Sequence, residues 1–222
     1  LRYEVLDGEQ LREREPSLNE QAVGGIHWLD PKTVSDPGAL TRGYAALFIK
    51  RGGQFIQGDA LTLKQLDGGW QVQTEQGPVS AEQAVIALGP QAPELFKPLG
   101  YRIPLAIKRG YHMHYSSLHD AQLQHSICDA QGGYVLAPMA QGIRLTTGIE
   151  FAESSDQAND IQLSRCEALA RKFYPLGERL DPEPWLGRRP CLPDMRPVIG
   201  PAVHHPGLWF NFGHAQIGRA HV

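Results

Sequence analysis

Two adjacent arginines in the segment "GRRPCLPD" have the clearest potential for ligand binding in this chain. The segment has the pattern of a β-strand, so Arg188 and Arg189 should point to opposite faces of a sheet. An inward guanidinium is costly to bury unless it meets an anion, and its planar fork suits a carboxylate held by two parallel hydrogen bonds. The alternative partner is a protein carboxylate such as Asp194. The residues alone therefore leave two readings open, a bound carboxylate ligand and an internal ion pair.

Other catalytic templates are absent from the sequence, which has no G-x-S-x-G, no P-loop, no H-E-x-x-H and no G-x-G-x-x-G. His112 and His114 would share a face of a strand, and with His119 they are candidate metal ligands. No carboxylate or cysteine completes a recognisable spacing around them, so we expect no metal site. The cysteines are far apart and include no C-x-x-C pair, which favours free thiols in a reducing, cytoplasmic setting.

Composition narrows the class of protein. The 222 residues include 41% apolar residues, which is enough for a substantial core, and carry a net charge of −3. Basic and acidic residues are interspersed, so the sequence has no polybasic tract for nucleic acid or an anionic membrane. No stretch approaches the roughly 18 apolar residues of a membrane span. We therefore expect a soluble globular protein that is cytoplasmic, or peripheral to a membrane without crossing it, and that does not bind nucleic acid.

Local signals place three helices. A short one should begin after a cap at Asp7 and end near Pro16. A second should begin with Asp36 as cap and Pro37 in its first turn, with one apolar face formed by Leu40, Tyr44, Leu47 and Phe48. A third should cover about 160–173, with Leu163, Cys166, Leu169 and Ala170 on one face.

Strands should occupy most of the remaining chain. We expect a strand at 54–58, then a hairpin around 67–69, where glycines tolerate positive φ. The run 84–88 is apolar on both faces, as in a central strand between two layers. From Leu105 onward, longer alternating strands predict an antiparallel sheet, and the proline-punctuated tail should complete a sheet. This order of elements predicts two interleaved domains of α+β character.

Several segments, in order along the chain, resemble the family of FAD-dependent D-amino-acid oxidases and dehydrogenases, and the bacterial D-amino-acid dehydrogenases most closely. The glycine and sarcosine oxidases share these landmarks. The segments are "GGIHWLDPKTVSDPGALTRGYAALFIKRGGQFIQG", "AEQAVIALGP", "IKRGYHMHY", "GGYVLAPMAQGIRLTTGIEF", "GRRPCLPDMRPVIGP" and "GLWFNFGH".

The resemblance implies roles for individual residues. Arg189 matches the arginine that holds the substrate carboxylate over the flavin, and Tyr134 matches a tyrosine that lines the substrate pocket. Among residues that would contact FAD, Gly89 ends a strand that passes the diphosphate and Ala60 stands where backbone groups meet the adenine. The remaining two, Gly213 and His214, match a turn whose backbone amides approach the flavin pyrimidine carbonyl.

The resemblance also implies a fold and a reaction. The fold would be mixed α/β and α+β: an incomplete FAD-binding Rossmann-like domain, at 35–90 and 190–216, interleaved with an antiparallel-sheet substrate domain, at 1–34 and 91–189. The enzyme would oxidise the C–N bond of a small amino acid by hydride transfer to FAD, giving an imino acid and then a 2-oxo acid and ammonia. Electrons would pass on to a quinone, a carrier or oxygen.

The family begins with a strand, a G-x-G-x-x-G turn and a helix that hold the FAD pyrophosphate, and this chain has no such turn. We therefore expect a fragment that is inactive by itself. The alternative is a non-catalytic binding module or subunit on the same scaffold without the cofactor. The last residues, "IGRAHV", do not resemble the family and fit an in-frame sequencing-adapter read, so 217–222 are expected to be a non-native tail.

Overall fold

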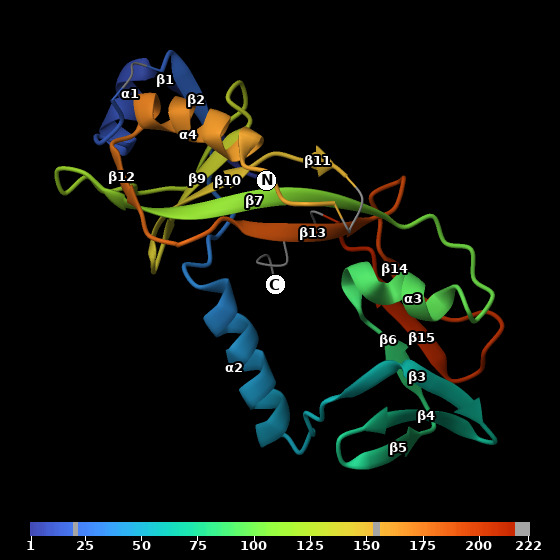
Figure 1. The fold of residues 1–222 in the computed structure, drawn as a ribbon. Helices are drawn as coiled ribbons and strands as arrows, with labels where there is room; N and C mark the ends of the chain where they lie inside the picture. Colours follow the sequence, from blue (N-terminus) through green and yellow to red (C-terminus); the bar gives the residue numbers. More distant parts are fainter. Residues whose placement is uncertain (20–21, 153–155, 216–222) are drawn as a thin grey trace.

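The computed structural model describes residues 1–19, 22–152 and 156–215. Its centre is a large antiparallel sheet, with helix α4 (Ile161–Phe173) lying along one face (Figure 1). A second body, made of smaller sheets, lies at the lower right of the view. Helix α2 (Pro37–Lys50) extends below the large sheet, beside this second body. The predicted mixture of helices with an antiparallel sheet is confirmed. Residues 216–222, and with them the expected non-native tail, lie outside the described residues.

The large sheet has seven strands and is organised around the longest of them, β7. Strands β10, β11, β12 and β13 all pair antiparallel with β7, while β9 and β8 extend the sheet beyond β10. One long strand therefore aligns residues from distant parts of the sequence. The bounds are β7 Ala106–Ser117, β8 Ile127–Asp129, β9 Tyr134–Met139, β10 Gly142–Thr147, β11 Glu150–Phe151, β12 Leu176–Arg179 and β13 Trp185–Cys191.

The first core lies between this sheet and α4. Side chains of Tyr111, Met113 and Tyr115 alternate along β7 and face the helix, as the period of a strand requires. The helix supplies Leu163, Cys166 and Ala170, all buried. The predicted helix at 160–173 is confirmed, but Leu169 is 41% exposed, so its place on the buried face was wrong.

A second core holds the smaller body together. Strand β15 (Leu208–Phe212) lies between β14 (Val198–Pro201), which is antiparallel to it, and β6 (Ala84–Ile86), which is parallel. A separate sheet contains β3 (Gly58–Leu66), β4 (Gly69–Thr74) and β5 (Gly77–Ala81). The core also includes Ala92, Leu95, Phe96 and Tyr101, beyond the expected boundary at residue 90. The domain division therefore stays a prediction.

Two strand expectations for this body need correction. The predicted strand at 54–58 is irregular as far as residue 57, and β3 begins only at Gly58. In β6, Ile86 is 1% exposed whereas Val85 is 60% exposed, so only one face of this strand is covered. The hairpin around 67–69 is confirmed, since β3 and β4 pair across it.

The first two helices begin where their caps predict. Asp7 accepts hydrogen bonds from the backbone of Glu9 and Gln10 and forms a capping box at the start of α1 (Gly8–Arg14). Asp36 accepts from the backbone of Ala39 at the start of α2. However, α2 makes no extensive contact with another helix or strand of the described residues, and its apolar side is exposed at Leu40, Tyr44, Leu47, Phe48 and Ile49.

The remaining elements were not predicted. Strands β1 (Tyr3–Asp7) and β2 (Gly24–Trp28) form a two-stranded sheet. A 3₁₀ turn, η1 (Gly89–Gln91), leads into the short helix α3 (Ala92–Phe96). No helix in the described ranges is both long and apolar enough to cross a membrane.

Candidate active site

Arg189 lies on the face of the large sheet opposite α4. Its cross-strand partner is Lys108 of β7, which points to the same face. Tyr111 and Met113 point to the opposite face, because side chains alternate along a strand, and they belong to the core under α4. The predicted split of the arginine pair is confirmed in exposure, because Arg188 is exposed and Arg189 is partly buried. The Arg189 Nη1 atom lies 3.5 Å from each of the backbone carbonyls of Arg109 and Gly148.

A glycine of β7 makes room for the Arg189 guanidinium. A Cβ atom on Gly110 would collide with Arg189 Nη1, and it would lie 2.9 Å from both Arg189 Nη2 and the carbonyl oxygen of Gly148. Gly110 is paired across the strands with Gly187, which also lacks a side chain. The guanidinium therefore lies over the Gly110 backbone, in the space that a larger residue at this position would fill.

Aromatic rings continue this face toward β12. The rings of His112 and Trp185 are stacked, with centroids 4.6 Å apart and planes at 21°. His114, next on the same face, is edge-on to His112 at 5.3 Å, and its Nδ1 is 2.8 Å from Asp181 Oδ2. As predicted from their spacing, His112 and His114 share a face.

Burial holds the pKa of His112 far below its ordinary value of 6.5, at about 4, and the neighbouring charges of Arg144 and His114 lower the pKa further, against an opposing effect of Asp181. The imidazole in the folded protein is therefore neutral at pH 7. As pH falls from 6.5 toward 4, the unfolded chain takes up a proton at His112 that the folded chain does not, so folding stability should fall.

The variant His112→Phe should lose less stability than the wild type over the same pH range, because phenylalanine keeps a flat ring against Trp185 and cannot titrate. Denaturant unfolding of both proteins between pH 6.5 and 4 measures this difference. Equal slopes of unfolding free energy against pH would show that His112 is protonated in the folded state too.

Three of the residues expected to contact FAD lie near one end of β13. Cys191, two residues after Arg189, forms an isolated bridge with His214, and the Ala215 amide donates to the Pro190 carbonyl at 2.9 Å. The turn that begins at Gly89 contacts β13 as well. Gly89 and Gly213 have φ of 54° and 80°, the left-handed region in which glycine is favoured.

Ala60 and Tyr134 lie apart from this group. Ala60 is on β3, partly buried against the second core. Tyr134 is 2% exposed in the first core, and its pairing with Thr147 sets it on the α4 side of the sheet. The structure therefore does not place the Tyr134 ring beside the Arg189 guanidinium, and a role for Tyr134 in the substrate pocket stays a prediction.

A buried ion pair is formed by Arg109, the residue of β7 whose backbone carbonyl lies 3.5 Å from Arg189 Nη1. Arg109 is 1% exposed and its Nη2 is 2.7 Å from Glu150 Oε2. Glu150 also accepts from the Tyr111 hydroxyl at 2.9 Å and from Asn159 Nδ2 at 2.6 Å. Burial alone raises the pKa of Glu150, but the hydrogen bonds from Arg109, Tyr111 and Asn159 together outweigh it and hold that pKa below 4.5.

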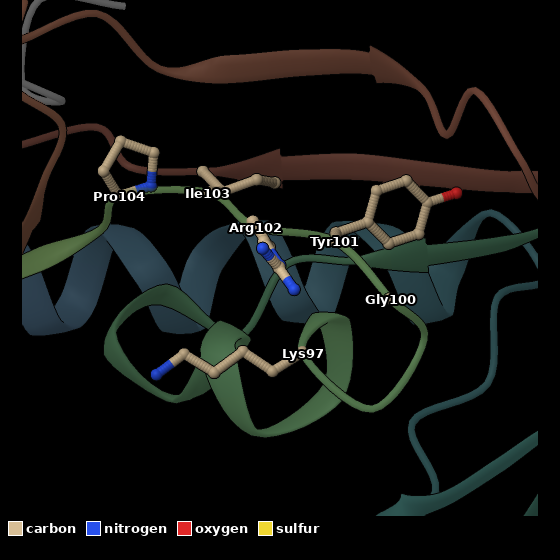
Figure 2. A pocket seen from close by; sticks show the side chains of 6 residues that line it. All are labelled: Lys97, Gly100, Tyr101, Arg102, Ile103 and Pro104. Atoms are coloured by element: carbon tan, nitrogen blue, oxygen red, sulfur yellow. The ribbon is translucent and has the colours of Figure 1, made fainter.

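A hollow elsewhere on the surface does not involve Arg189. The hollow, of about 620 Å³, lies beside the end of α3 and is lined by Lys97 and residues 100–104. Figure 2 shows the side chains that line it. None of the residues predicted for the site lines it. Among the described residues, no three His, Cys, Asp or Glu side chains are gathered as metal ligands would be.

The sequence predicts Arg189 as a site residue but gives no prediction for Gly110 and Trp185, which lie on the same face of the sheet. A glycine inside an alternating strand often marks a close approach of another group, so Gly110 and Gly187 carried a usable signal. Nothing local could show that the two glycines are paired, because their strands are far apart in the sequence.

Comparisons with known proteins place the chain in a family. The model of the DAO family, described as "FAD dependent oxidoreductase", matches residues 1–219. A D-amino acid dehydrogenase of Rhizobium rhizogenes is 33% identical over 97% of this chain and 53% of its own length. A D-amino-acid oxidase of Bradyrhizobium diazoefficiens is 27% identical over 96% of this chain and 52% of its own length.

Solved structures agree on the fold. Glycine oxidase from Geobacillus kaustophilus matches 99% of this chain and 59% of its own with a TM-score of 0.83 at 22% identity. An L-α-glycerophosphate oxidase from Mycoplasma pneumoniae, solved with FAD bound, matches 98% of this chain and 61% of its own with a TM-score of 0.78 at 18% identity. The chain thus spans about half the length of the curated relatives that it matches. It belongs to the DAO family of FAD-dependent oxidoreductases.

Proposed function

We propose that this chain is the substrate-binding part, with a portion of the cofactor-binding part, of a flavoprotein that oxidises the C–N bond of a small D-amino acid. The observation that carries the proposal is the Arg189 guanidinium, which lies over Gly110 and whose planar fork suits a ligand carboxylate. The names of the relatives, D-amino acid dehydrogenase and D-amino-acid oxidase, support an amino acid as the ligand.

The described residues fit FAD as the cofactor. Gly89 and Gly213 combine positive φ with positions near β13, and the space where a Gly89 Cβ would lie is open. Gly89, Gly213 and His214 would hold FAD close to Arg189, and Ala60 would contact it from β3. FAD, when bound, supplies the oxidant for the amino acid.

Arg189 fixes the substrate through its carboxylate, so that the Cα–H bond has one orientation relative to the cofactor. Loss of the Cα hydride and of a proton from the amine leaves an imino acid, which water converts to a 2-oxo acid and ammonia. The amine lone pair assists departure of the hydride, so no side chain need act as base once the amine is neutral. The electrons then pass to a quinone, a carrier or oxygen.

The function is tested in the full-length protein that contains this chain, with D-alanine, glycine and sarcosine as substrates and a dye as electron acceptor. We expect turnover that releases one ammonia for each pair of electrons with D-alanine or glycine. Sarcosine would release methylamine instead. A full-length protein that holds no FAD and turns over no amino acid would favour the non-catalytic binding module.

Gly110→Ala should lower kcat/KM for the amino acid by about 10²-fold, because the added methyl group displaces the Arg189 guanidinium. Gly25→Ala provides a matched control, since its Cβ would lie at ordinary contact distances of 3.8 and 3.9 Å from the Leu11 side chain. The comparison of kcat/KM between the two variants is decisive. Equal values would mean that the guanidinium does not bind the substrate where the structure places it.

We further propose that the 222-residue chain is a fragment that does not hold FAD by itself. It contains no G-x-G-x-x-G turn for the pyrophosphate, and the apolar side of α2 lies exposed, as a surface that further polypeptide would cover. The purified chain should therefore be colourless, whereas the full-length protein should be yellow. One FAD per chain in the purified 222-residue protein, by flavin absorbance, would contradict this.

A further inference from the structure

One aromatic ring lies directly beside Arg189 on the same face of the large sheet. A Cβ atom on Gly187 would collide with the end of the Trp185 ring, 2.7 Å from its Cη2 atom. Gly187 is the cross-strand partner of Gly110, over which the Arg189 guanidinium lies. Paired Cα atoms in an antiparallel sheet are about 5 Å apart, so the ring and the guanidinium occupy neighbouring places above one glycine floor.

The Trp185 ring is fixed on one side and open on the other. Stacking on His112 holds one side of the ring at a centroid distance of 4.6 Å. The residue is nevertheless 59% exposed, which leaves a large aromatic surface free in the described structure. Rigid, half-open aromatic rings provide contact area at small entropic cost, and aromatic pairs add attraction beyond the area that they bury.

The surroundings of the ring favour an uncharged partner. His112 is neutral at pH 7, because burial and the nearby charge of Arg144 keep its pKa at about 4. Arg144 acts on His112 from the far side of the stacked pair, and the charge of Arg189 on the near side is one that the substrate carboxylate would neutralise. A ligand group above Trp185 thus meets aromatic carbon and glycine backbone on this side.

We propose that Trp185 contributes to substrate specificity, by contacting the side chain of the amino acid whose carboxylate Arg189 binds, so that aromatic side chains are accepted as well as small ones. This inference rests on the proposed function. Trp185 contacts the substrate and not the reacting atoms, so its effect falls on the choice among amino acids.

The test uses the full-length flavoprotein and the ratio of kcat/KM for D-phenylalanine to that for D-alanine. In Trp185→Ala this ratio should fall about tenfold, and Trp185→Phe should retain most of it. Trp28→Ala provides a matched control, because Trp28 is 49% exposed on a different sheet and should leave the ratio unchanged. If Trp185→Ala does not fold, Trp185→Leu replaces it. The ratio of kcat/KM for D-phenylalanine to that for D-alanine should then be lower in Trp185→Leu than in Trp185→Phe.

Two results would overturn the inference while leaving the proposed function intact. One is an unchanged ratio in Trp185→Ala, or equal ratios in the leucine and phenylalanine variants. The other is a wild-type protein that oxidises D-alanine but not D-phenylalanine. Failure of the proposed function is distinguishable from both, since the wild type would then oxidise no amino acid.

Discussion

Arg189→Met should lower kcat/KM for the amino-acid substrate by about 10²- to 10³-fold in the full-length protein, measured with an electron-acceptor dye. Methionine keeps much of the side-chain length and removes the charge, so the substrate carboxylate would be buried without its partner. Loss of one member of a buried, hydrogen-bonded charge pair costs about 2–5 kcal/mol, which is about 30- to 5,000-fold, and the expected loss lies in the middle of that range.

Two further variants make the Arg189 prediction specific. Arg189→Lys should fall between the wild type and Arg189→Met, because an ammonium is a point charge and cannot hold both carboxylate oxygens in one plane. Arg188→Met is the matched control, since Arg188 is the exposed neighbour that points to the other face of β13. A larger loss of kcat/KM in Arg188→Met than in Arg189→Met would show that Arg188 binds the carboxylate, and would contradict the role of Arg189.

Glu150→Leu should lower the melting temperature by about 10 °C, because it leaves the Arg109 guanidinium in the first core without its carboxylate. The ion pair between Arg109 Nη2 and Glu150 Oε2, 2.7 Å long, joins β7 to β11. Arg109 also donates to the carbonyls of Asp156 and Gln157, at 2.6 and 3.1 Å, so the same guanidinium holds the segment before α4.

The double variant Arg109→Met/Glu150→Leu should be more stable than Glu150→Leu alone, because removal of both partners leaves no unpaired charge. Thermal unfolding of the wild type, both single variants and the double variant completes a mutant cycle. Additive losses in the double variant would show that the two residues do not act as a pair.

The lowered pKa of Glu150 also makes folding stability sensitive to acid. Its pKa is lower in the folded protein than its ordinary value of 4.5, so the stability that it contributes is present above about that pH and is lost as pH falls through the lower folded value. The His112 contribution is lost over a higher range, from pH 6.5 downward. Unfolding of His112→Phe and of Glu150→Leu at each pH therefore separates the two contributions to the pH dependence of folding stability.

Local chemistry made the starts of the first two helices predictable. Asp7 and Asp36 cap their helices through hydrogen bonds to backbone groups two or three residues later, so the signal and its structural result lie in one short segment. The same holds for the hairpin around Asp67. The exposed side of α2 could not be foreseen, because a helical pattern shows that a face is apolar and not whether anything covers it.

The site was only partly predictable for the opposite reason. Arg189 was found from its residue type, its strand pattern and a family resemblance. Its placement depends on the register between β7 and β13, which sets Gly110 opposite Gly187 and His112 opposite Trp185. Register depends on two strands that are far apart in the sequence, and no single segment determines it. The pairing of Gly110 with Gly187 and the stacking of His112 on Trp185 could therefore be seen only in the structure.

The central claim is that Arg189 binds the carboxylate of an amino acid that the flavoprotein oxidises. Its most direct test is anaerobic mixing of the full-length protein with D-alanine and, separately, with D-alaninamide, which has the same amine and Cα–H but no carboxylate. The account predicts that D-alanine bleaches the flavin absorbance rapidly and that D-alaninamide does so at least about 10²-fold more slowly. Equal rates of bleaching by the two compounds would contradict it.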